Sequence, residues 1–397
     1  MTNQATIQPA FAMSRIWRDE KSRGVAIQII VVLAFFISVA WLVGNVTANF
    51  AALDKTFGFK FLWQLPANYD INQTLIDYNN QDNHLCAALV GLINTFLVAV
   101  VGIVLATILG FIVGALRLSD NWLVARLAYV YIEAMRNVPV LLHILLWHGI
   151  IINTLPHPRR AIGVGDAMFL SNRGLYLPRP VLEDGFGLVL IAFAAAVIVA
   201  AGYHRRARRI QRETGRQIHS LWIGFAVIVA VTALAYLAAG APVAFEMPAL
   251  RGFNFQGGIT LLPEFVALTL ALSIYTSAFI AENVRGGILA IHKGQTEAAQ
   301  SIGLRPNRVL TLVVLPQALR VIIPPLTSQY LNLTKNSSLA IAIGYMDLVA
   351  TLGGITLNQT GREMEAMMLV MLVYLAISLL ISAFMKWYNN RVRLVER

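Results

Sequence analysis

Four consecutive polar residues interrupt an apolar region in the last third of the chain: Lys335, Asn336, Ser337 and Ser338. A charged side chain within a membrane-sized apolar region is costly to bury and usually serves a function. Helices that break inside a membrane often expose backbone groups that line a binding site near the midplane. The ammonium group of Lys335 could therefore face a carboxylate, with the amide and the two hydroxyls beside it.

A structural role competes with this interpretation. Lys335 could instead pair with Asp347 or Glu133, or extend to a membrane interface. Asn94 and Thr95, in an earlier apolar stretch, raise the same choice between contacting a bound molecule and bonding to a neighbouring helix. Polar residues of this kind commonly hold helices together, so the second role is favoured for the pair. For Lys335 the sequence leaves both roles open.

The chain carries no pattern typical of catalysis or of metal binding. His143 and His148 are five residues apart with no neighbouring carboxylate, so a metal pair is not expected. The nucleotide-binding pattern GxxxxGK[ST] is absent from the sequence, so the chain is not expected to bind ATP. A membrane enzyme would need His, Asp or Glu clustered at one membrane face, and no such cluster occurs. We therefore predict no catalytic residues, no cofactor and no metal ion.

Composition indicates what must position these residues. The chain is 57% hydrophobic and 13% charged, with a mean hydropathy of +0.66, whereas soluble domains are about 25% charged. Several stretches reach the roughly 20 apolar residues that cross a bilayer, and we find no strand-sized alternating segments. We predict an all-α polytopic membrane protein with about eight spans. They are 25–44, 87–116, 137–155, 186–203, 220–239, 263–283, about 320–344 and 363–385.

The seventh span is the least regular. Pro324-Pro325 and the polar run at 335–338 interrupt it, and it resumes through 339–344. It could be one kinked span, or a span followed by a re-entrant piece, so the number of spans could lie between seven and nine. Loop 156–185 holds four prolines and is predicted to be turn-rich rather than helical. Loop 240–262 is rich in Gly and Pro and is expected outside, and residues 345–362 are also expected outside.

The basic residues are unevenly distributed. The formal net charge is +11, and 22 of the 31 Lys and Arg residues fall on segments expected inside. That bias follows the positive-inside rule and places both termini in the cytoplasm; it does not indicate a nucleic-acid partner. The arginine-rich stretch 204–219 is expected near anionic lipid headgroups. The inside segments are 1–24, 117–136, 204–219, 284–320 and 386–397.

A polar, helix-forming stretch lies between two of these apolar regions, from Glu297 to Pro316. Gln295–Ile302 is predicted to be helical, and Gly303 suits a left-handed stop after a helix. Pro306 then blocks continuation, and Asn307 can cap a second helix. The stretch should therefore form two short helices that meet at a turn and face a partner.

The first of these helices offers a small surface. Glu297 is expected in its first turn, where the helix dipole favours a carboxylate. Ala298 and Ala299 would let the side chains of a partner approach closely. The spacing is specific: the Glu-Ala-Ala triplet is followed after three residues by Gly303, and after nine more by Val313, with Leu315-Pro316 beyond.

This pattern resembles the EAA loop of permease subunits of ATP-binding-cassette importers, with Val313 in place of the usual isoleucine. The likeness extends over much of the chain and points to the polar-amino-acid branch of the family. Residues 156–262 depart from the compact members of that branch, because they insert two extra spans. The enlarged layout is similar to the larger permease of general L-amino acid importers. The segments that carry the likeness are 92–119, 131–148, 277–304 and 333–344.

The resemblance implies a type I permease core with two inserted spans in the bacterial inner membrane, carrying L-amino acids by alternating access. It implies four kinds of partner: a second and different permease, an ATPase dimer that binds the ATP, a periplasmic binding protein, and membrane lipids. It assigns coupling to the ATPase to Glu297, Ala298, Ala299, Gly303, Leu315 and Pro316. Asn94, Thr95 and the run 335–338 are the candidates for the substrate pathway.

The expected organisation follows from this resemblance. Residues 1–24 and 387–397 would be cytoplasmic tails, and 25–86 a first span with a long periplasmic loop. Residues 87–386 would be the permease domain, containing the 156–262 insertion and the coupling loop at 284–319. The alternative is a secondary, ion-coupled amino-acid transporter, which would need intramembrane acids and a repeat between its halves. We see no such repeat, and acids occur only at peripheral positions of the spans.

Overall fold

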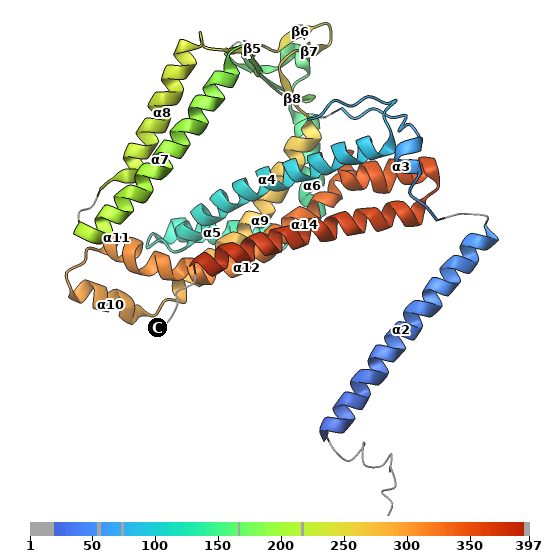
Figure 1. Cartoon of the computed structure of the whole chain (residues 1–397), viewed down its shortest axis with the longest axis horizontal. Coiled ribbons are helices and arrows are strands. Elements are labelled where there is room, and N and C mark those ends of the chain that lie inside the picture. The colour runs from blue at the N-terminus through green and yellow to red at the C-terminus, as the bar shows by residue number, and fades with distance from the viewer. Residues whose placement is uncertain (1–19, 54–56, 73–74, 166, 216–217, 393–397) are drawn as a thin grey trace, which may run out of the picture. The chain divides into compact units, whose positions relative to one another are not determined.

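The computed structural model describes residues 20–53, 57–72, 75–165, 167–215 and 218–392 (Figure 1). The chain divides into two compact units, Met1–Leu62 and Trp63–Arg397. The first contains α2 (Glu20–Ala52), a 33-residue apolar helix. At about 1.5 Å per residue this helix is long enough to cross a bilayer. Of the two expected tails, 1–19 and 393–397 lie outside the described residues, while 20–24 and 387–392 continue helices.

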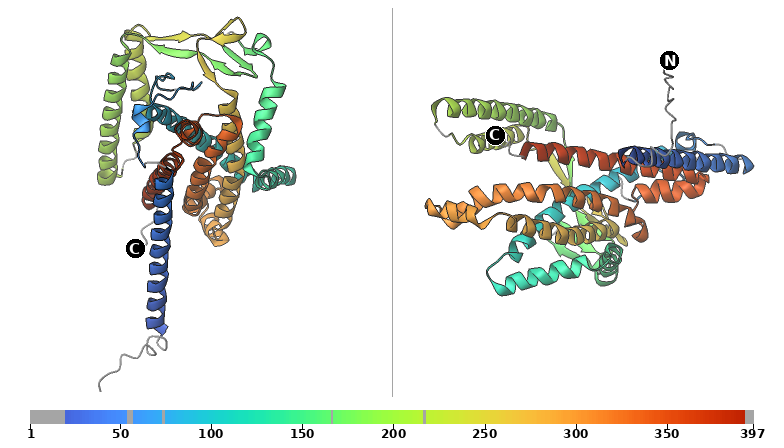
Figure 2. Two further views of the ribbon diagram at one scale, coloured as in Figure 1. Left: turned by 90° about the vertical axis from the view of Figure 1, so that its right-hand side faces the viewer. Right: turned by 90° about the horizontal axis from the view of Figure 1, so that it is seen from below.

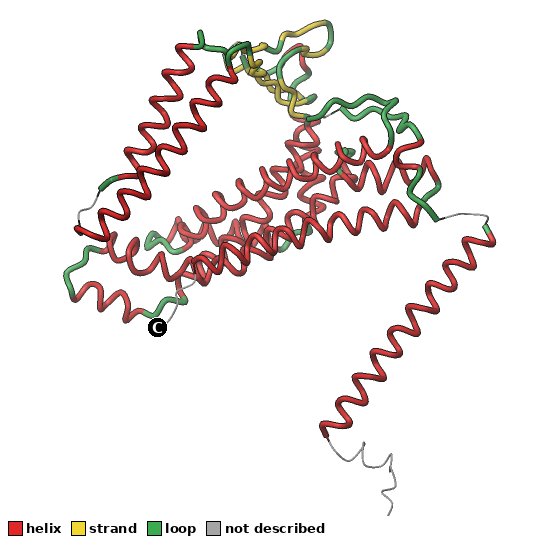
Figure 3. Tube along the Cα trace, in the orientation of Figure 1, coloured by secondary structure: helices red, strands yellow, loops and turns green. Residues whose placement is uncertain are grey.

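The second unit is a bundle of long helices with short strands at one end (Figures 1 and 3). Its hydrophobic core is drawn chiefly from α4, α6, α9 and α12. Its helices are α4 (His84–Arg117), α5 (Trp122–Arg136), α6 (Val140–Thr154), α7 (Phe186–Thr214), α8 (Ser220–Ala238), α9 (Pro263–Leu289), α10 (Lys293–Ser301), α11 (Pro306–Val309), α12 (Leu315–Asn336), α13 (Leu357–Thr360) and α14 (Glu363–Val392). Shorter turns of helix are η1 (Pro158–Arg160), η2 (Leu310–Val314), η3 (Ser337–Ile343) and η4 (Val349–Thr356), and α3 (Phe61–Gln64) lies at the boundary between the units.

The described residues hold seven helices long and apolar enough to cross a membrane, or eight if the bent pair α5–α6 counts as one span. The predicted number of about eight is therefore confirmed. Between α5 and α6 the chain bends by 103°. Pro139 accounts for the break, because proline disfavours helical backbone at the residue before it.

One predicted detail of the seventh span is wrong, because helix α12 runs without a break through Pro324 and Pro325. In residues 345–362, which were predicted only to lie outside, η4 and α13 make most of the segment helical. Several of its residues are buried against α4 and α14, Asp347 among them. Hydrophobicity alone missed this segment because it is short and contains polar residues.

Helices α4 and α9 form the most extensive helix contact in the bundle. Small residues allow this close approach, as is usual between helices in membranes. A side chain at Gly114 would place its Cβ 2.8 Å from the carbonyl oxygen of Ala281. A side chain at Gly110 would lie 2.5 Å from Cγ2 of Ile280. Ser273 on α9 adds a hydrogen bond of 3.3 Å from its Oγ to the Gly102 carbonyl oxygen.

The two loops 156–185 and 240–262, for which no strands were predicted, contain eight strands of three or four residues. A four-stranded antiparallel sheet has the order β1-β2-β3-β8, and β4-β5 and β6-β7 form two-stranded ribbons. The prediction missed them because strands this short show too few alternations to be recognised. The strands are β1 (Ile162–Val164), β2 (Met168–Ser171), β3 (Gly174–Leu177), β4 (Arg179–Leu182), β5 (Val243–Glu246), β6 (Ala249–Arg251), β7 (Asn254–Gln256) and β8 (Ile259–Leu261).

The sheet connects the insertion to the bundle. Strand β8 pairs with β3, with Leu175 opposite Leu261, and then leads through Leu262 directly into α9. Gly174 permits this pairing, because a Cβ there would lie 2.5 Å from the Leu261 carbonyl oxygen and its φ is +135°. The two inserted helices, α7 and α8, pack against each other as a hairpin (Figure 2). Both are apolar over a membrane-sized window, as predicted for 186–203 and 220–239.

Candidate functional site

Helix α10 lies at the end of the bundle opposite the strands (Figure 1). The predicted stop is confirmed, since Gly303 has a φ of +83° and its N–H donates to the Gln300 carbonyl oxygen at 2.8 Å. The predicted cap of the second helix is wrong, because that helix starts at Pro306 with Arg305, not Asn307, before it. Helix α10 is capped by His292, whose side chain accepts from the Gly294 N–H at 3.1 Å.

The exposed face of α10 differs in part from the prediction. Glu297 and Ala298 are exposed, but Ala299 is buried within the loop, where α10 packs on α11 and η2. Glu297 is not in the first turn, because the helix already begins at Lys293. Ile302 is 78% exposed, an unusual position for a large apolar side chain. Sequence reasoning missed Ile302, although a bulky apolar residue directly before a left-handed glycine was a visible signal.

Two long elements hold α10 from either side. Helix α9 ends at Leu289, four residues before α10 starts. After the Gly303 turn, α11, η2, α12 and η3 run on as one helical element from Pro306 to Ile343. Leu315 is half-buried and Pro316 is exposed, both near the start of α12. A displacement of α10 would therefore act on the ends of two elements that extend to the opposite end of the bundle.

Lys335 lies in the last turn of α12 and is exposed in the single chain. It has no ion-pair partner among the residues that the structure describes, which excludes the predicted pairing with Asp347 or Glu133 there. The Asp347 carboxylate instead accepts from the Ala350 N–H at 2.8 Å and from the Tyr374 hydroxyl at 3.3 Å. The carboxylate of Glu133 accepts from the Asn137 side chain at 3.2 Å.

The neighbours of Lys335 bond within their own helix. The Ser337 hydroxyl is buried and donates to the Thr334 carbonyl oxygen at 2.7 Å. The Ser338 hydroxyl donates to the Lys335 carbonyl oxygen at 2.7 Å. Asn336 is half-buried at the end of α12. A role for these four residues in a substrate pathway stays a prediction.

Asn94 and Thr95 are buried in α4 and bond across to the segment that follows η3. The side-chain amide of Asn94 donates to the Met346 carbonyl oxygen at 2.9 Å. The Thr95 hydroxyl accepts from the Leu348 N–H at 3.1 Å. Both residues thus hold the turn after η3 against α4, which matches the interhelical role favoured from the sequence; a contact with substrate stays a prediction.

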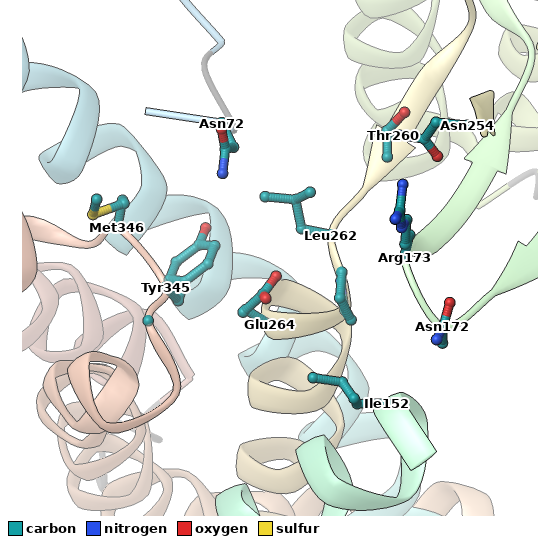
Figure 4. A pocket seen from close by; sticks show the side chains of 12 residues that line it. Asn72, Ile152, Asn172, Arg173, Asn254, Thr260, Leu262, Glu264, Tyr345 and Met346 are labelled. Atoms are coloured by element: carbon teal, nitrogen blue, oxygen red, sulfur yellow. The ribbon is translucent and has the colours of Figure 1, made fainter. Parts of the chain in front are cut away.

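A polar cavity of about 560 Å³ lies at the strand end of the bundle (Figure 4). It is bounded by the β2–β3 turn, by residues of β7 and β8, by the end of α6, by the start of α9 and by the turn at 344–346. Two of the lining residues carry charge: Arg173 from the β2–β3 turn and Glu264 from the first turn of α9. Sequence reasoning missed both, because it placed them in or beside loops with no structure of their own.

The described residues hold seven or eight helices of membrane-spanning length, and the bundle has a helical loop at one end and a polar cavity at the other, an arrangement typical of a multi-span membrane transport subunit. The chain belongs to the family of binding-protein-dependent transport system inner membrane components, whose family model matches residues 106–394. The match includes the whole of α10 and its flanking helices.

Three relatives align with nearly the whole chain. The general L-amino acid transport system permease protein AapQ of Rhizobium johnstonii is 47% identical, over 96% of this chain and 94% of its own length. The putative amino-acid ABC transporter permease protein YhdX of Escherichia coli is 50% identical, over 93% and 94%. The glutamate/glutamine/aspartate/asparagine transport system permease protein BztB of Rhodobacter capsulatus is 47% identical, over 98% and 97%. The alignments therefore include the 156–262 insertion.

Proposed function

We propose that this chain is a permease subunit of an ATP-driven importer that carries L-amino acids across the bacterial inner membrane by alternating access. The names of the three relatives that align with nearly the whole chain support the substrate class. The observation that carries the mechanism is the position of α10, which links the end of α9 to the helical element Pro306–Ile343. A partner that binds α10 and displaces it would therefore move the ends of both elements.

The partner that displaces α10 would be a separate ATPase dimer. The chain itself has no GxxxxGK[ST] pattern, so it would need no cofactor, and ATP would be bound by the partner. Glu297, Ala298 and Ile302 would meet that partner, since their side chains are exposed on or directly after α10. Gly303 would keep the turn tight, because its φ of +83° disfavours any side chain.

The α10 end would face the cytoplasm, with both termini on that side. The Lys and Arg residues support this orientation, since 22 of 31 lie on segments at the proposed inner side. The strand end, with its polar cavity, would then face the periplasm and a binding protein that delivers amino acids. A second permease, different from this chain, would complete the membrane part, as the family resemblance implies.

Reconstitution tests the proposal. The chain is co-expressed with a candidate second permease, ATPase and binding protein, and the complex is placed in liposomes. We expect uptake that requires ATP, and ATP hydrolysis that rises when the binding protein carries its amino acid. Uptake driven by an ion gradient without ATP would instead establish the secondary-transporter alternative.

A matched pair of variants tests the role of α10. Gly303→Asp is expected to lose both co-purification of the ATPase and uptake. Gly215→Asp is the control, because Gly215 also ends a helix with a positive φ, +72°, and has open space around it, yet lies outside the loop. If Gly303→Asp retained the ATPase and full uptake, the assignment of α10 as the coupling helix would fail.

A further inference from the structure

The polar cavity at the strand end has hydrogen-bond donors on one wall. Arg173 is exposed on the β2–β3 turn, and its guanidinium has no ion-pair partner within the described ranges of the chain. Asn254 lies beside it, and its Oδ1 accepts from the buried Tyr176 hydroxyl at 2.7 Å. That bond leaves the Asn254 NH₂ group free to donate. Thr260 on β8 adds a hydroxyl. A guanidinium with amide and hydroxyl donors around it suits a carboxylate.

Another wall carries the opposite charge. Glu264 lies in the first turn of α9 with 26% of its side chain exposed. Within the described part of the chain, the basic side chain found within 4.0 Å of it is that of His148, whose Nε2 lies 4.0 Å from the Glu264 carboxylate. A gap of this length is longer than a hydrogen bond, so the carboxylate retains capacity to accept. Figure 4 shows Glu264 and Arg173 on separate elements around the same cavity.

The remaining lining is mixed in character. Ile152, Leu262 and Met346 contribute apolar surface, and Tyr345 contributes a ring that is almost fully buried. A volume of about 560 Å³ falls within the range of small-molecule sites. A cavity lined by one cationic side chain, one anionic side chain and some apolar surface suits a zwitterion with a variable side chain.

The cavity also touches both elements that carry α10. Leu262 and Glu264 belong to the start of α9, and Gly344 ends the helical element that begins at Pro306. Occupancy of the cavity would thus contact the ends of α9 and of Pro306–Ile343 that lie far from α10. Arg173 and Asn254 come from the 156–262 insertion, whose role the sequence left unexplained.

We propose that this cavity is an amino-acid-binding vestibule to which the insertion contributes five of the twelve lining residues, with Arg173 binding the carboxylate and Glu264 the ammonium group. The inference rests on the proposed function, since it takes the L-amino acid as its ligand. The proposal adds a binding site before the substrate pathway at 335–338. It also assigns the strands of the insertion a role in binding the substrate.

Direct binding tests the vestibule separately from transport. The purified transporter complex in lipid nanodiscs, without ATP or binding protein, is titrated with L-glutamine and with its methyl ester, which lacks the carboxylate. Wild type is expected to bind the ester roughly tenfold or more weakly, the loss typical of one charge-assisted contact. Arg173→Ala should bind L-glutamine roughly tenfold more weakly and should no longer distinguish it from the ester.

Two further variants complete the design. Arg179→Ala is the control, because Arg179 is an exposed arginine of the same strand region outside the cavity, and it should bind as wild type does. Glu264→Gln should lose discrimination between L-glutamine and 4-carbamoylbutanoate, its analogue without the amino group. Because Glu264 lies on a different element from Arg173, this variant supplies a second measurement if Arg173→Ala folds poorly.

The outcomes separate the two proposals. Equal affinity of wild type and Arg173→Ala for L-glutamine would overturn the vestibule, as would the absence of binding in wild type. The vestibule would also be overturned if Arg173→Ala or Glu264→Gln weakened binding of the binding protein to the transporter but left binding of the free amino acid unchanged. The cavity would then be a protein-docking surface. ATP-driven uptake, measured with the same purified complexes reconstituted in liposomes with ATP and the binding protein, decides the proposed function independently of these results.

Discussion

The hydroxyl of Thr95 in α4 accepts a hydrogen bond of 3.1 Å from the backbone N–H of Leu348, a residue 253 positions later in the chain. Both residues are buried, and the same hydroxyl donates to the Gly91 carbonyl oxygen at 2.9 Å. The bond fixes the turn between η3 and η4 against α4. That turn follows the helical element that begins at Pro306, so Thr95 helps to anchor the end of the element that lies far from α10.

Thr95→Val should destabilise the protein. Valine keeps the shape of threonine but leaves the buried Leu348 N–H without a partner, which costs about 1–3 kcal/mol. The melting temperature in detergent should fall, and limited proteolysis should cleave the segment around residue 348 first. Thr95→Ser retains the hydroxyl and should behave more like wild type. Equal stability of Thr95→Val and wild type would show that this hydrogen bond does not hold the turn.

Gly114→Val should prevent α4 and α9 from packing. The added Cβ would lie 2.8 Å from the Ala281 carbonyl oxygen, and backbone cannot move aside as a side chain can. We expect a loss of about 3 kcal/mol or more, at or beyond the upper end for an overpacked core. Folded yield by size-exclusion chromatography is the measurement. Gly202→Ala on α7, where a Cβ meets open space, should leave the yield unchanged, and a normal yield of Gly114→Val would refute the packing argument.

Ile302→Ser should weaken association with the ATPase without affecting the fold. An isoleucine that is 78% exposed and becomes buried in a partner contributes about 1.5–3 kcal/mol, or roughly tenfold to a hundredfold in affinity. Retention of the ATPase during purification, followed by titration, measures the effect. Ile162→Ser changes another exposed isoleucine, in β1, and should have no effect. Full retention by Ile302→Ser would mean that Ile302 stays outside the interface.

Lys335→Met should reduce uptake while leaving stability nearly unchanged. Lys335 is exposed in the single chain and forms no ion pair with any described residue, so its removal breaks no internal contact. If the ammonium group of Lys335 binds the carboxylate of the substrate, the variant should lose uptake. Initial uptake rates measure this loss. Lys386→Met, at an exposed position in α14, is the matched control. Wild-type uptake by Lys335→Met would remove Lys335 from the substrate pathway.

Local chemistry accounts for the parts that sequence reasoning predicted well. The spans follow from apolar length, and the stop of α10 follows from Gly303, because only glycine adopts its φ of +83° without strain. The favoured structural role of Asn94 and Thr95 follows from the cost of leaving polar groups unpaired in an apolar setting. Each of these features depends on a few residues that are neighbours in the chain, so the sequence was sufficient to predict them.

Other features depend on contacts between residues that are distant in the chain. The strands of the insertion form because β3 pairs with β8, more than 80 residues later, and short strands carry little signal before they pair. Asp347 is buried because its segment folds back against α4 and α14. The sequence by itself thus determined a multi-span membrane protein with a helical loop shaped by Gly303. Only the tertiary structure placed Arg173 and Glu264 on one cavity, since packing free energy, not chain order, brings such residues together.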